Sequence, residues 1–329
     1  MTHSFRPPRH LRNAHLQSVL PSLQIRRIWV QRRARALLAA SRDVVLDCGG
    51  GVRLLGHHAA SRTGHGPRVV LLHGWEGSAD SVYVLSVAAY LFERGFDVFR
   101  LNFRDHGRTH HLNPDLFHSC RLSDVVGALR AVTGTDSRPL ALVGYSLGGN
   151  FALRVAARAG VEGLALRSVV AVCPVLDPAR TLIELERITP LYRRYFVHKW
   201  RQSLKAKLAA WPDRYRREEL LEGRDLTRMT EHLVIRYTEY PDLPSYLDGY
   251  AVVGNVLAGL TVPCHVLLAA DDPIIPVDDV DRLARPPALD VRVIEQGGHC
   301  GFLESVGGES WADREIHRLL AGQERPSAL

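Results

Sequence analysis

Short apolar runs and amphipathic segments alternate along most of the chain. Runs such as PRVVLLHG at 67–74 and FDVFRLNF at 96–103 are rich in β-branched or aromatic residues, which predicts buried strands. Segments 81–95 and 122–134 carry apolar residues at helical spacing and end in glycine, which predicts helices. This rhythm predicts a mostly parallel sheet with helices on both faces.

Further segments extend the pattern on either side. Two β-rich runs flank Gly49, Gly50 and Gly51, which predicts a hairpin. The other predicted strands are at 139–146, 166–175, 262–273 and 291–298. The other predicted helices are at 147–160, 278–284 and 309–322. Ser123 or Asp124 is available to cap the helix at 122–134.

The rhythm breaks at Asp177-Pro178. From there to Pro244 the pattern is helical, with many arginines and aromatic residues, and strands resume afterwards. We therefore expect a basic N-terminal arm packed on the core at 1–42, a core at 43–177 and 245–322, and an inserted helical cap at 178–244. Such an insertion would lie over the carboxyl ends of the strands, where open α/β sheets bind ligands.

Charge and composition narrow the classes of function. The net charge is +7, and nine arginines precede the first acidic residue, Asp43. No nucleic-acid-binding module accompanies this charge, so we expect no nucleic-acid partner, although the arm could contact a membrane surface. No apolar run is long enough for a membrane span, and the N-terminus does not resemble a secretory signal. Five scattered cysteines fit a reducing, cytoplasmic location.

One glycine-flanked serine carries the first chemical signal. Gly144-Tyr145-Ser146-Leu147-Gly148 fits G-x-S-x-G and lies between a predicted strand and a predicted helix. In this motif the sharp turn exposes a nucleophilic serine. The alternative is a glycine-rich turn in which the serine only caps the helix.

A nucleophilic serine needs a base and a carboxylate that orients the base. His299 follows Gly297-Gly298 after the last predicted strand, at the same edge of the sheet as Ser146. Asp272 is the expected carboxylate, Asp271 its close competitor, and Asp177 a weaker candidate. The order Ser146, Asp272, His299 is the order of α/β-hydrolase triads.

Two backbone amides are expected to form an oxyanion hole. One belongs to Leu147, at the start of the helix, and the other to Trp75, in the loop after strand 67–74. A separate histidine-rich stretch contains His106, His110, His111 and His118. Its spacing is irregular for a metal site, so we expect no metal or other cofactor.

Several stretches together resemble a known superfamily. They are FRPPRHLRNAHLQSVLP, LLHGWEGSADSVYVLSVAAYLFERGFDVFRLNFRDHG, LFHSC followed by LSD, GYSLGGN, and LAADDPIIP with GGHCGF. The chain resembles the α/β-hydrolase superfamily, in the branch of YheT-like hydrolases, alcohol acetyltransferases and abhydrolase-domain lipases. The resemblance implies an α/β-hydrolase fold and a triad of Ser146, Asp272 and His299.

The combined expectation is a serine esterase or lipase. It would cleave short- to medium-chain acyl esters or acylglycerols through an acyl-enzyme on Ser146. Two alternatives stay open: an acyltransferase that passes the acyl group to an alcohol, and a non-catalytic binding protein that keeps the hydrolase fold. The sequence leaves the oligomeric state open.

Overall fold

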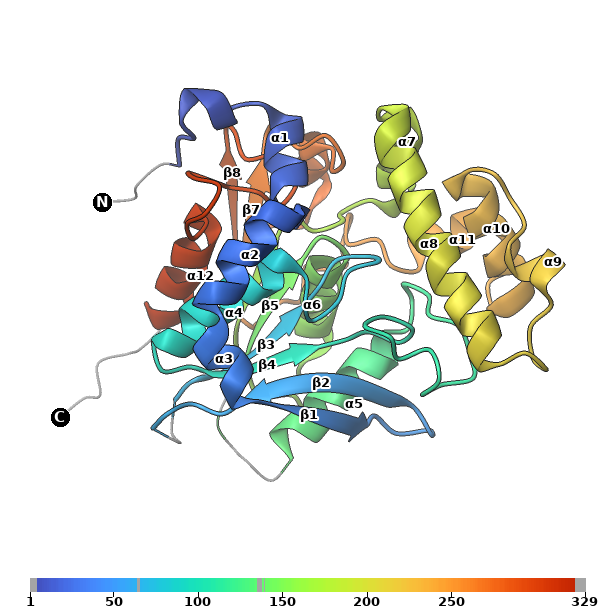
Figure 1. Cartoon of the computed structure of the whole chain (residues 1–329), viewed down its shortest axis with the longest axis horizontal. Helices are drawn as coiled ribbons and strands as arrows, with labels where there is room; N and C mark the ends of the chain where they lie inside the picture. The colour runs from blue at the N-terminus through green and yellow to red at the C-terminus, as the bar shows by residue number, and fades with distance from the viewer. Residues whose placement is uncertain (1–4, 64–65, 135–137, 139, 323–329) are drawn as a thin grey trace.

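The computed structural model describes residues 5–63, 66–134, 138 and 140–322, and it centres on an eight-stranded sheet (Figure 1). Pro139, the first residue of one predicted strand, lies outside these ranges. The strands are β1 (Ser41–Asp47), β2 (Arg53–Ala59), β3 (Arg68–Leu72), β4 (Asp97–Leu101), β5 (Leu140–Tyr145), β6 (Leu166–Val172), β7 (Cys264–Ala269) and β8 (Leu289–Ile294).

The strands follow the order β1-β2-β4-β3-β5-β6-β7-β8. β2 pairs antiparallel with both β1 and β4, and every pairing from β4 to β8 is parallel. The three glycines Gly49, Gly50 and Gly51 all have positive φ at the β1–β2 turn, a conformation that glycine adopts without strain. This mostly parallel sheet confirms the predicted fold class.

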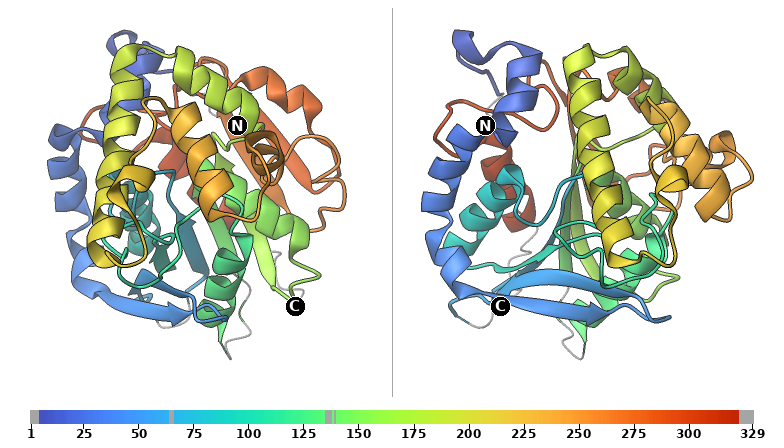
Figure 2. Two further views of the ribbon diagram at one scale, coloured as in Figure 1. Left: turned by 90° about the vertical axis from the view of Figure 1, so that its right-hand side faces the viewer. Right: turned by 45° about the vertical axis from the view of Figure 1, so that its right-hand side comes forward.

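Alternate residues of the central strands face opposite layers of helices. Val70 and Leu72 of β3 pack in one hydrophobic cluster with α5 (Leu122–Thr133) and α6 (Leu147–Arg158). Val69 and Leu71 pack in the other, with α4 (Val82–Glu93) and α12 (Trp311–Ala321). The right-hand view of Figure 2 shows the sheet between these layers. Burial of both faces explains why the strands read as continuous apolar runs.

Five helices connect β6 to β7. They are α7 (Pro178–Arg187), α8 (Pro190–Ala210), α9 (Arg217–Leu220), α10 (Leu226–Tyr237) and α11 (Leu243–Asp248). The arrowheads of β3 and β4 point toward this group in Figure 1. We propose that these helices form the cap over the carboxyl edge of the sheet.

A buried lysine anchors α8 to the core. The Lys207 ammonium donates to the Asp105 carboxylate at 2.7 Å and to the carbonyls of Asn113 and Asp115 at 2.7 and 2.8 Å. Lys207 is fully buried, and burial lowers its pKa while Asp105 opposes that effect. A buried charge is tolerated only when it is paired and hydrogen-bonded, as this one is. The contact therefore ties the helix to the loop that follows β4.

The N-terminal arm folds into helices that the charge pattern did not predict. They are η1 (Arg9–Leu11), α1 (Ala14–Val19), η2 (Leu20–Ser22), α2 (Gln24–Arg33) and α3 (Arg35–Ala40). Val30 of α2 and Leu37 of α3 are buried in the cluster that contains α4. The arm thus extends the α4–α12 layer (Figure 1).

Two local details differ from the sequence predictions. The helix predicted at 278–284 is the 3₁₀-helix η3 (Val277–Arg282). Neither Ser123 nor Asp124 caps α5, because Arg121 occupies the N-cap position and makes no side-chain cap. The Asp124 carboxylate accepts two hydrogen bonds from the buried Arg104 guanidinium instead, at 2.8 and 3.0 Å. This charged pair uses the acceptor oxygens that a cap would have needed.

Among the described residues, no helix combines the length and the apolar character that a membrane span requires.

Candidate active site

Ser146 stands at a strained turn between β5 and α6. Its φ of 53° and ψ of −118° lie outside the regions that L-residues prefer, and its side chain makes no capping hydrogen bond to α6. Glycines permit this turn. A Cβ on Gly148 would lie 2.5 Å from the carbonyl oxygens of Leu72 and His73, and one on Gly144 would lie 2.1 Å from the Gly148 carbonyl oxygen. The turn therefore holds the Ser146 side chain clear of the helix that follows it.

His299 and Asp272 are joined by a hydrogen bond. The His299 Nδ1 atom lies 2.9 Å from Oδ2 and 3.2 Å from Oδ1 of Asp272. The carboxylate is fully buried, and its Oδ1 also accepts from the amides of Ile274 and Ile275 at 2.8 and 3.0 Å. These donors fix the carboxylate, so the hydrogen bond fixes the orientation of the imidazole ring.

The two competing aspartates have other partners. Asp271 Oδ1 accepts from the amides of Gly297 and Gly298, each at 2.8 Å, so Asp271 shapes the loop that carries His299. Asp177 caps α7 through the amides of Ala179 and Arg180. Its other oxygen accepts from Arg282. Of the three candidates, Asp272 is the one whose carboxylate contacts the His299 ring.

The turn after β3 lies against the Ser146 side chain. A Cβ on Gly74 would lie 3.3 Å from the Ser146 Cβ, which shows how close the two turns are. The His73 ring is hydrogen-bonded to the backbone of this turn. Its Nε2 accepts from the Phe103 amide at 3.2 Å, so its Nδ1 carries the proton and donates to the Gly74 carbonyl at 2.7 Å.

Both residues whose amides are expected to bind the oxyanion line the cavity that contains Ser146. Trp75 follows Gly74, and Leu147 is the first residue of α6. Neither amide donates a hydrogen bond to another group within the described part of the chain. An amide without a protein partner at a helix N-terminus is suited to an anionic oxygen.

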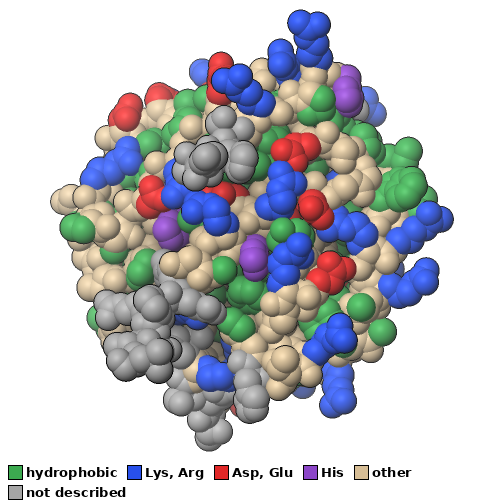
Figure 3. Space-filling view, turned by 90° about the vertical axis from the view of Figure 1, so that its left-hand side faces the viewer, with side chains coloured by type: hydrophobic (Ala, Val, Ile, Leu, Met, Phe, Trp, Pro, Cys, Tyr) green, Lys and Arg blue, Asp and Glu red, His purple; other side chains and the backbone are tan. Residues whose placement is uncertain are grey.

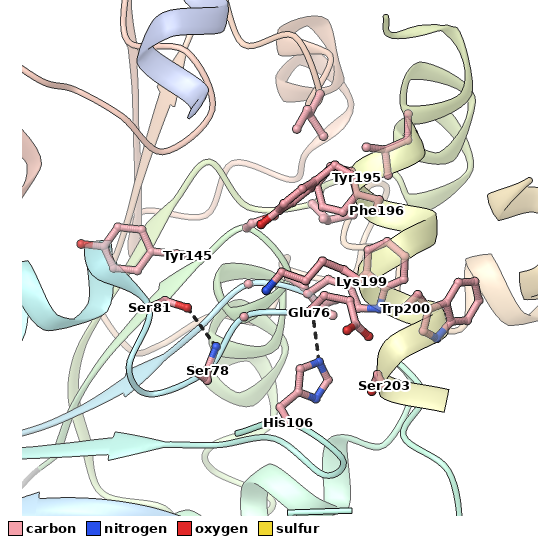
Figure 4. A pocket seen from close by; sticks show the side chains of 18 of the residues that line it. Glu76, Ser78, Ser81, His106, Tyr145, Tyr195, Phe196, Lys199, Trp200 and Ser203 are labelled. Carbon is pink, nitrogen blue, oxygen red and sulfur yellow. Dashed lines mark hydrogen bonds between the residues drawn. The ribbon is translucent and has the colours of Figure 1, made fainter. Parts of the chain in front are cut away.

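Ser146 and His299 open into one cavity of about 950 Å³. The described contacts include no direct hydrogen bond between these two side chains, and such bonds are often loose before substrate binds. Aromatic residues of α8 pack on Trp75 at the cavity wall: the Trp75 ring stacks on Phe196 at 5.7 Å and meets Trp200 edge-on at 5.2 Å. Figure 4 shows Phe196, Lys199 and Trp200 projecting from α8 toward the loop of Glu76.

Burial and neighbouring charges shift the pKa values of two groups at the cavity, His299 and Glu76. Burial alone would lower the pKa of His299, but the Asp272 carboxylate, together with Cys300, raises it well above its ordinary value. The imidazolium form is therefore stabilised. Burial raises the pKa of Glu76 to about 7, with Lys199 lowering it and Asp105 raising it. A carboxyl group on the cavity wall thus titrates near neutrality.

The arm supports the His299 loop, a role that the sequence analysis missed. The Ser18 hydroxyl accepts from the His299 amide at 2.8 Å. Gln17 is fully buried; its amide group donates to the carbonyls of Leu11 and Leu303 at 2.8 and 3.0 Å and accepts from the Leu303 amide at 2.8 Å. Gln17 and Ser18 lie in a stretch that resembles the superfamily, but no pattern in the sequence links that stretch to the site.

The histidine-rich stretch borders the cavity. His106 Nε2 accepts from the Glu76 amide at 3.2 Å, and its Nδ1 is 2.7 Å from the Arg104 carbonyl oxygen. His110 Nε2 lies 2.9 Å from the Ser203 hydroxyl on α8. These rings connect the loop after β4 with the Glu76 turn and the cap.

Comparison with known proteins agrees with this architecture. A model of the alpha/beta hydrolase family matches residues 69–309. An Escherichia coli (strain K12) protein named "Putative esterase YheT" is 26% identical over 303 residues, covering 91% of this chain and 87% of that protein. A pimeloyl-[acyl-carrier protein] methyl ester esterase of Methylococcus capsulatus is 31% identical over 271 residues, covering 79% of this chain and 96% of that protein.

Solved structures share the fold at lower identity. An esterase of Pyrococcus furiosus superposes with a TM-score of 0.57 at 15% identity, covering 86% of this chain and 89% of that one. The family model spans most of the chain, and the sheet is mostly parallel with helices on both faces as predicted, so the resemblance drawn from the sequence is confirmed. The chain belongs to the alpha/beta hydrolase family.

Proposed function

We propose that the protein is a serine hydrolase that cleaves carboxylic esters through an acyl-enzyme on Ser146. The observation that carries the proposal is that His299, hydrogen-bonded to the buried Asp272 carboxylate, lines the same cavity as Ser146 on its strained turn. Relatives named as esterases support the choice of esters.

Each group then has one role. His299 accepts the Ser146 proton through Nε2 as Ser146 Oγ attacks the ester carbonyl carbon. Asp272 stabilises the resulting imidazolium through Nδ1–H. The amides of Trp75 and Leu147 donate to the oxyanion, and losing one such donor typically costs about 2.7–4 kcal/mol of transition-state stabilisation. His299 returns the proton to the leaving alkoxide, and water then releases the acyl group by the same steps.

The cavity supports an acyl ester with an apolar chain. Trp75, Phe196 and Trp200 form an aromatic wall, and Val19 and Leu23 of the arm also line the cavity. An apolar wall of this kind removes an acyl chain from water, which favours binding. We assign short- to medium-chain acyl esters or acylglycerols as the substrate class.

A substrate screen with a matched variant tests this proposal. p-Nitrophenyl esters from acetate to palmitate are assayed with the wild type and Ser146→Ala, with and without ethanol so that transfer to an alcohol is also measured. We expect Ser146→Ala to lower turnover by at least ~10³-fold and to abolish labelling by a fluorophosphonate probe. Retained turnover or labelling in a folded Ser146→Ala protein would refute the assignment.

We further propose that the arm touches an anionic lipid surface. Side chains on its outer face are apolar and exposed, among them Ile25 (57%), Ile28 (53%) and Trp29 (48%). Arg27 is half-buried and Arg32 is exposed on the same helix, whereas Arg26 is buried, and no acidic residue precedes Asp43. Figure 3 shows basic and hydrophobic side chains along its right-hand rim, which is the side that faces the viewer in Figure 1, where α1–α3 lie in front. Because Val19 and Leu23 also line the cavity, this face would present the cavity mouth to lipid esters.

A further inference from the structure

Two thiols meet the imidazole of His299 at the base of the cavity. One ligand atom from each of Cys173, His299 and Cys300 can be chosen such that all three lie within 4.8 Å of one another. The Cys300 amide is 3.4 Å from the Cys173 Sγ, and both cysteines are free thiols. Cys173 follows β6, whereas Cys300 follows His299, so segments 127 residues apart converge here.

The backbone holds both thiols in place. Cys173 has a φ of 43° and Cys300 a φ of 61°, conformations that L-residues rarely adopt. The Cys173 amide donates to the Leu267 carbonyl at 2.7 Å, which fixes this strained residue against β7. Cys300 lines the cavity beside His299, and Cys173 is fully buried. A small ion that enters the cavity would therefore meet Cys300 and His299 first.

Two thiolates and an imidazole are a donor set for thiophilic cations. Zn²⁺ takes tetrahedral sites with Zn–S near 2.3 Å and Zn–N near 2.0–2.1 Å, which puts neighbouring ligand atoms about 3.5–3.8 Å apart. From separations of at most 4.8 Å, the ligand atoms would need to approach one another by at most about 1.3 Å to reach that geometry. Three protein ligands would leave a fourth tetrahedral position for a water molecule.

We propose that Cys173, Cys300 and His299 form a site for a thiophilic divalent cation such as Zn²⁺, and that its binding switches the esterase off. The second half of this statement rests on the proposed function, in which His299 is the base. Each cysteine that binds releases its proton to solvent, so two thiolates balance the charge of the ion.

Binding at either nitrogen of His299 would disable the base. An ion on Nε2 takes the lone pair that would accept the Ser146 proton. An ion on Nδ1 displaces the hydrogen bond to Asp272 that orients the ring. The cation is therefore an inhibitor here and not a cofactor of the reaction. The sequence does not reveal this site as a metal-binding motif, because Cys173 lies 127 residues before Cys300 in the chain.

Cadmium titration tests the site independently of activity. The full-length protein is reduced with a phosphine, treated with EDTA, desalted and titrated with Cd²⁺, and thiolate-to-cadmium charge-transfer absorption is followed. We expect the band to saturate at one ion per chain, also in Ser146→Ala. Ester turnover of the wild type should fall as the band grows. Zn²⁺ added in a parallel titration should also lower turnover. EDTA should then restore turnover in both titrations.

Matched variants assign the ligands. Cys300→Ser and Cys173→Ser should each weaken Cd²⁺ binding at least about tenfold and weaken inhibition equally, relative to the untreated activity of the same variant. Cys48→Ser, a thiol in the β1–β2 hairpin, should change neither. If Cys173→Ser does not fold, Cys173→Ala replaces it.

Each failure has a distinct meaning. Absence of the band in the wild type, or a band that survives in Cys300→Ser, overturns the metal site whether or not the protein is active. A saturated band with unchanged turnover overturns the inhibition. A saturated band in a protein that cleaves no ester and does not react with a fluorophosphonate leaves the ion site standing and overturns the proposed function.

Discussion

Asp271 and Asp272 are neighbours in the chain, and their carboxylates do different work because they accept from different donors. Asp272 contacts the His299 ring, and Asp271 holds the amides of Gly297 and Gly298. From the sequence, Asp272 is the expected carboxylate and Asp271 its close competitor, because adjacent residues at a turn can each point toward the loop of His299. The choice between them depends on backbone amides whose positions no local pattern encodes.

Substitution of each aspartate by asparagine should separate the two roles. Asparagine at 271 keeps an oxygen that can accept from both glycine amides, so Asp271→Asn should retain turnover within about tenfold. Asp272→Asn removes the charge that stabilises the His299 imidazolium, and the proposed mechanism predicts a fall in kcat of about 10³–10⁴-fold. Steady-state kinetics and thermal melting of the two variants provide the measurement. Equal kcat values for both would contradict the assignment of Asp272.

The Glu76 carboxyl should make substrate choice depend on pH. Its pKa of about 7 means that it is neutral below pH 7 and anionic above, facing Lys199 of α8 and Asp105 and His106 of the loop after β4. For an acyl ester that ends in a carboxylate, KM should rise as the pH passes through 7, relative to a neutral ester of the same length, because like charges then repel.

Glu76→Gln supplies the control for this effect. The variant keeps the size of the side chain and removes its titration, so the ratio of the two KM values should no longer change near pH 7. A ratio that still changes in Glu76→Gln would assign the effect to another group.

Helices and strands could be predicted from the sequence where their apolar side chains are buried against the core. The core strands were predictable because both faces are covered, as with Val69 and Val70 on opposite sides of β3. The arm was predicted only as a basic, core-packed segment. Its helices were not predicted, because residues such as Ile25 and Trp29 stay exposed and give no apolar stripe that matches a core. The role of Gln17 was unpredictable because its partner Leu303 lies 286 residues away.

Removing the Gln17 side chain should weaken both stability and turnover. Gln17→Ala leaves the carbonyl of Leu11 and both backbone groups of Leu303 without their partner, and one unsatisfied buried group typically costs about 1–3 kcal/mol. We expect the free energy of unfolding to fall by at least that amount and kcat to fall because the His299 loop loosens. Gln31→Ala, on the exposed face of α2, is the control. Denaturant unfolding that matches wild type would contradict the structural role of Gln17.

For the molecule as a whole, apolar and basic side chains share the face of the arm beside the cavity mouth. Single exposed apolar residues are common on protein surfaces, and Val161, after α6, is one. The arm differs because Ile25, Ile28 and Trp29 fall in one segment without acidic residues, and the adjoining Arg27 lines the cavity. Attraction to anionic lipid and burial of these side chains would reinforce each other there.

Vesicle sedimentation tests this surface. The wild type should bind vesicles that contain anionic lipid, bind neutral ones more weakly, and lose binding as salt is raised, because screening weakens the attraction. The double variant Ile28→Ser/Trp29→Ser should bind several-fold less, and Val161→Ser should bind as wild type. No binding to anionic vesicles at low salt would rule out the lipid surface.

The contact of Ser18 with the His299 amide also has a consequence for folding during synthesis on the ribosome. The two residues are separated by 281 positions, so a ribosome adding about 5–20 residues per second makes His299 roughly 15–60 s after Ser18. Throughout that interval α1 has no loop to support. A growing chain therefore cannot hold His299 in place through Ser18 until all eight strands of the sheet have been synthesised.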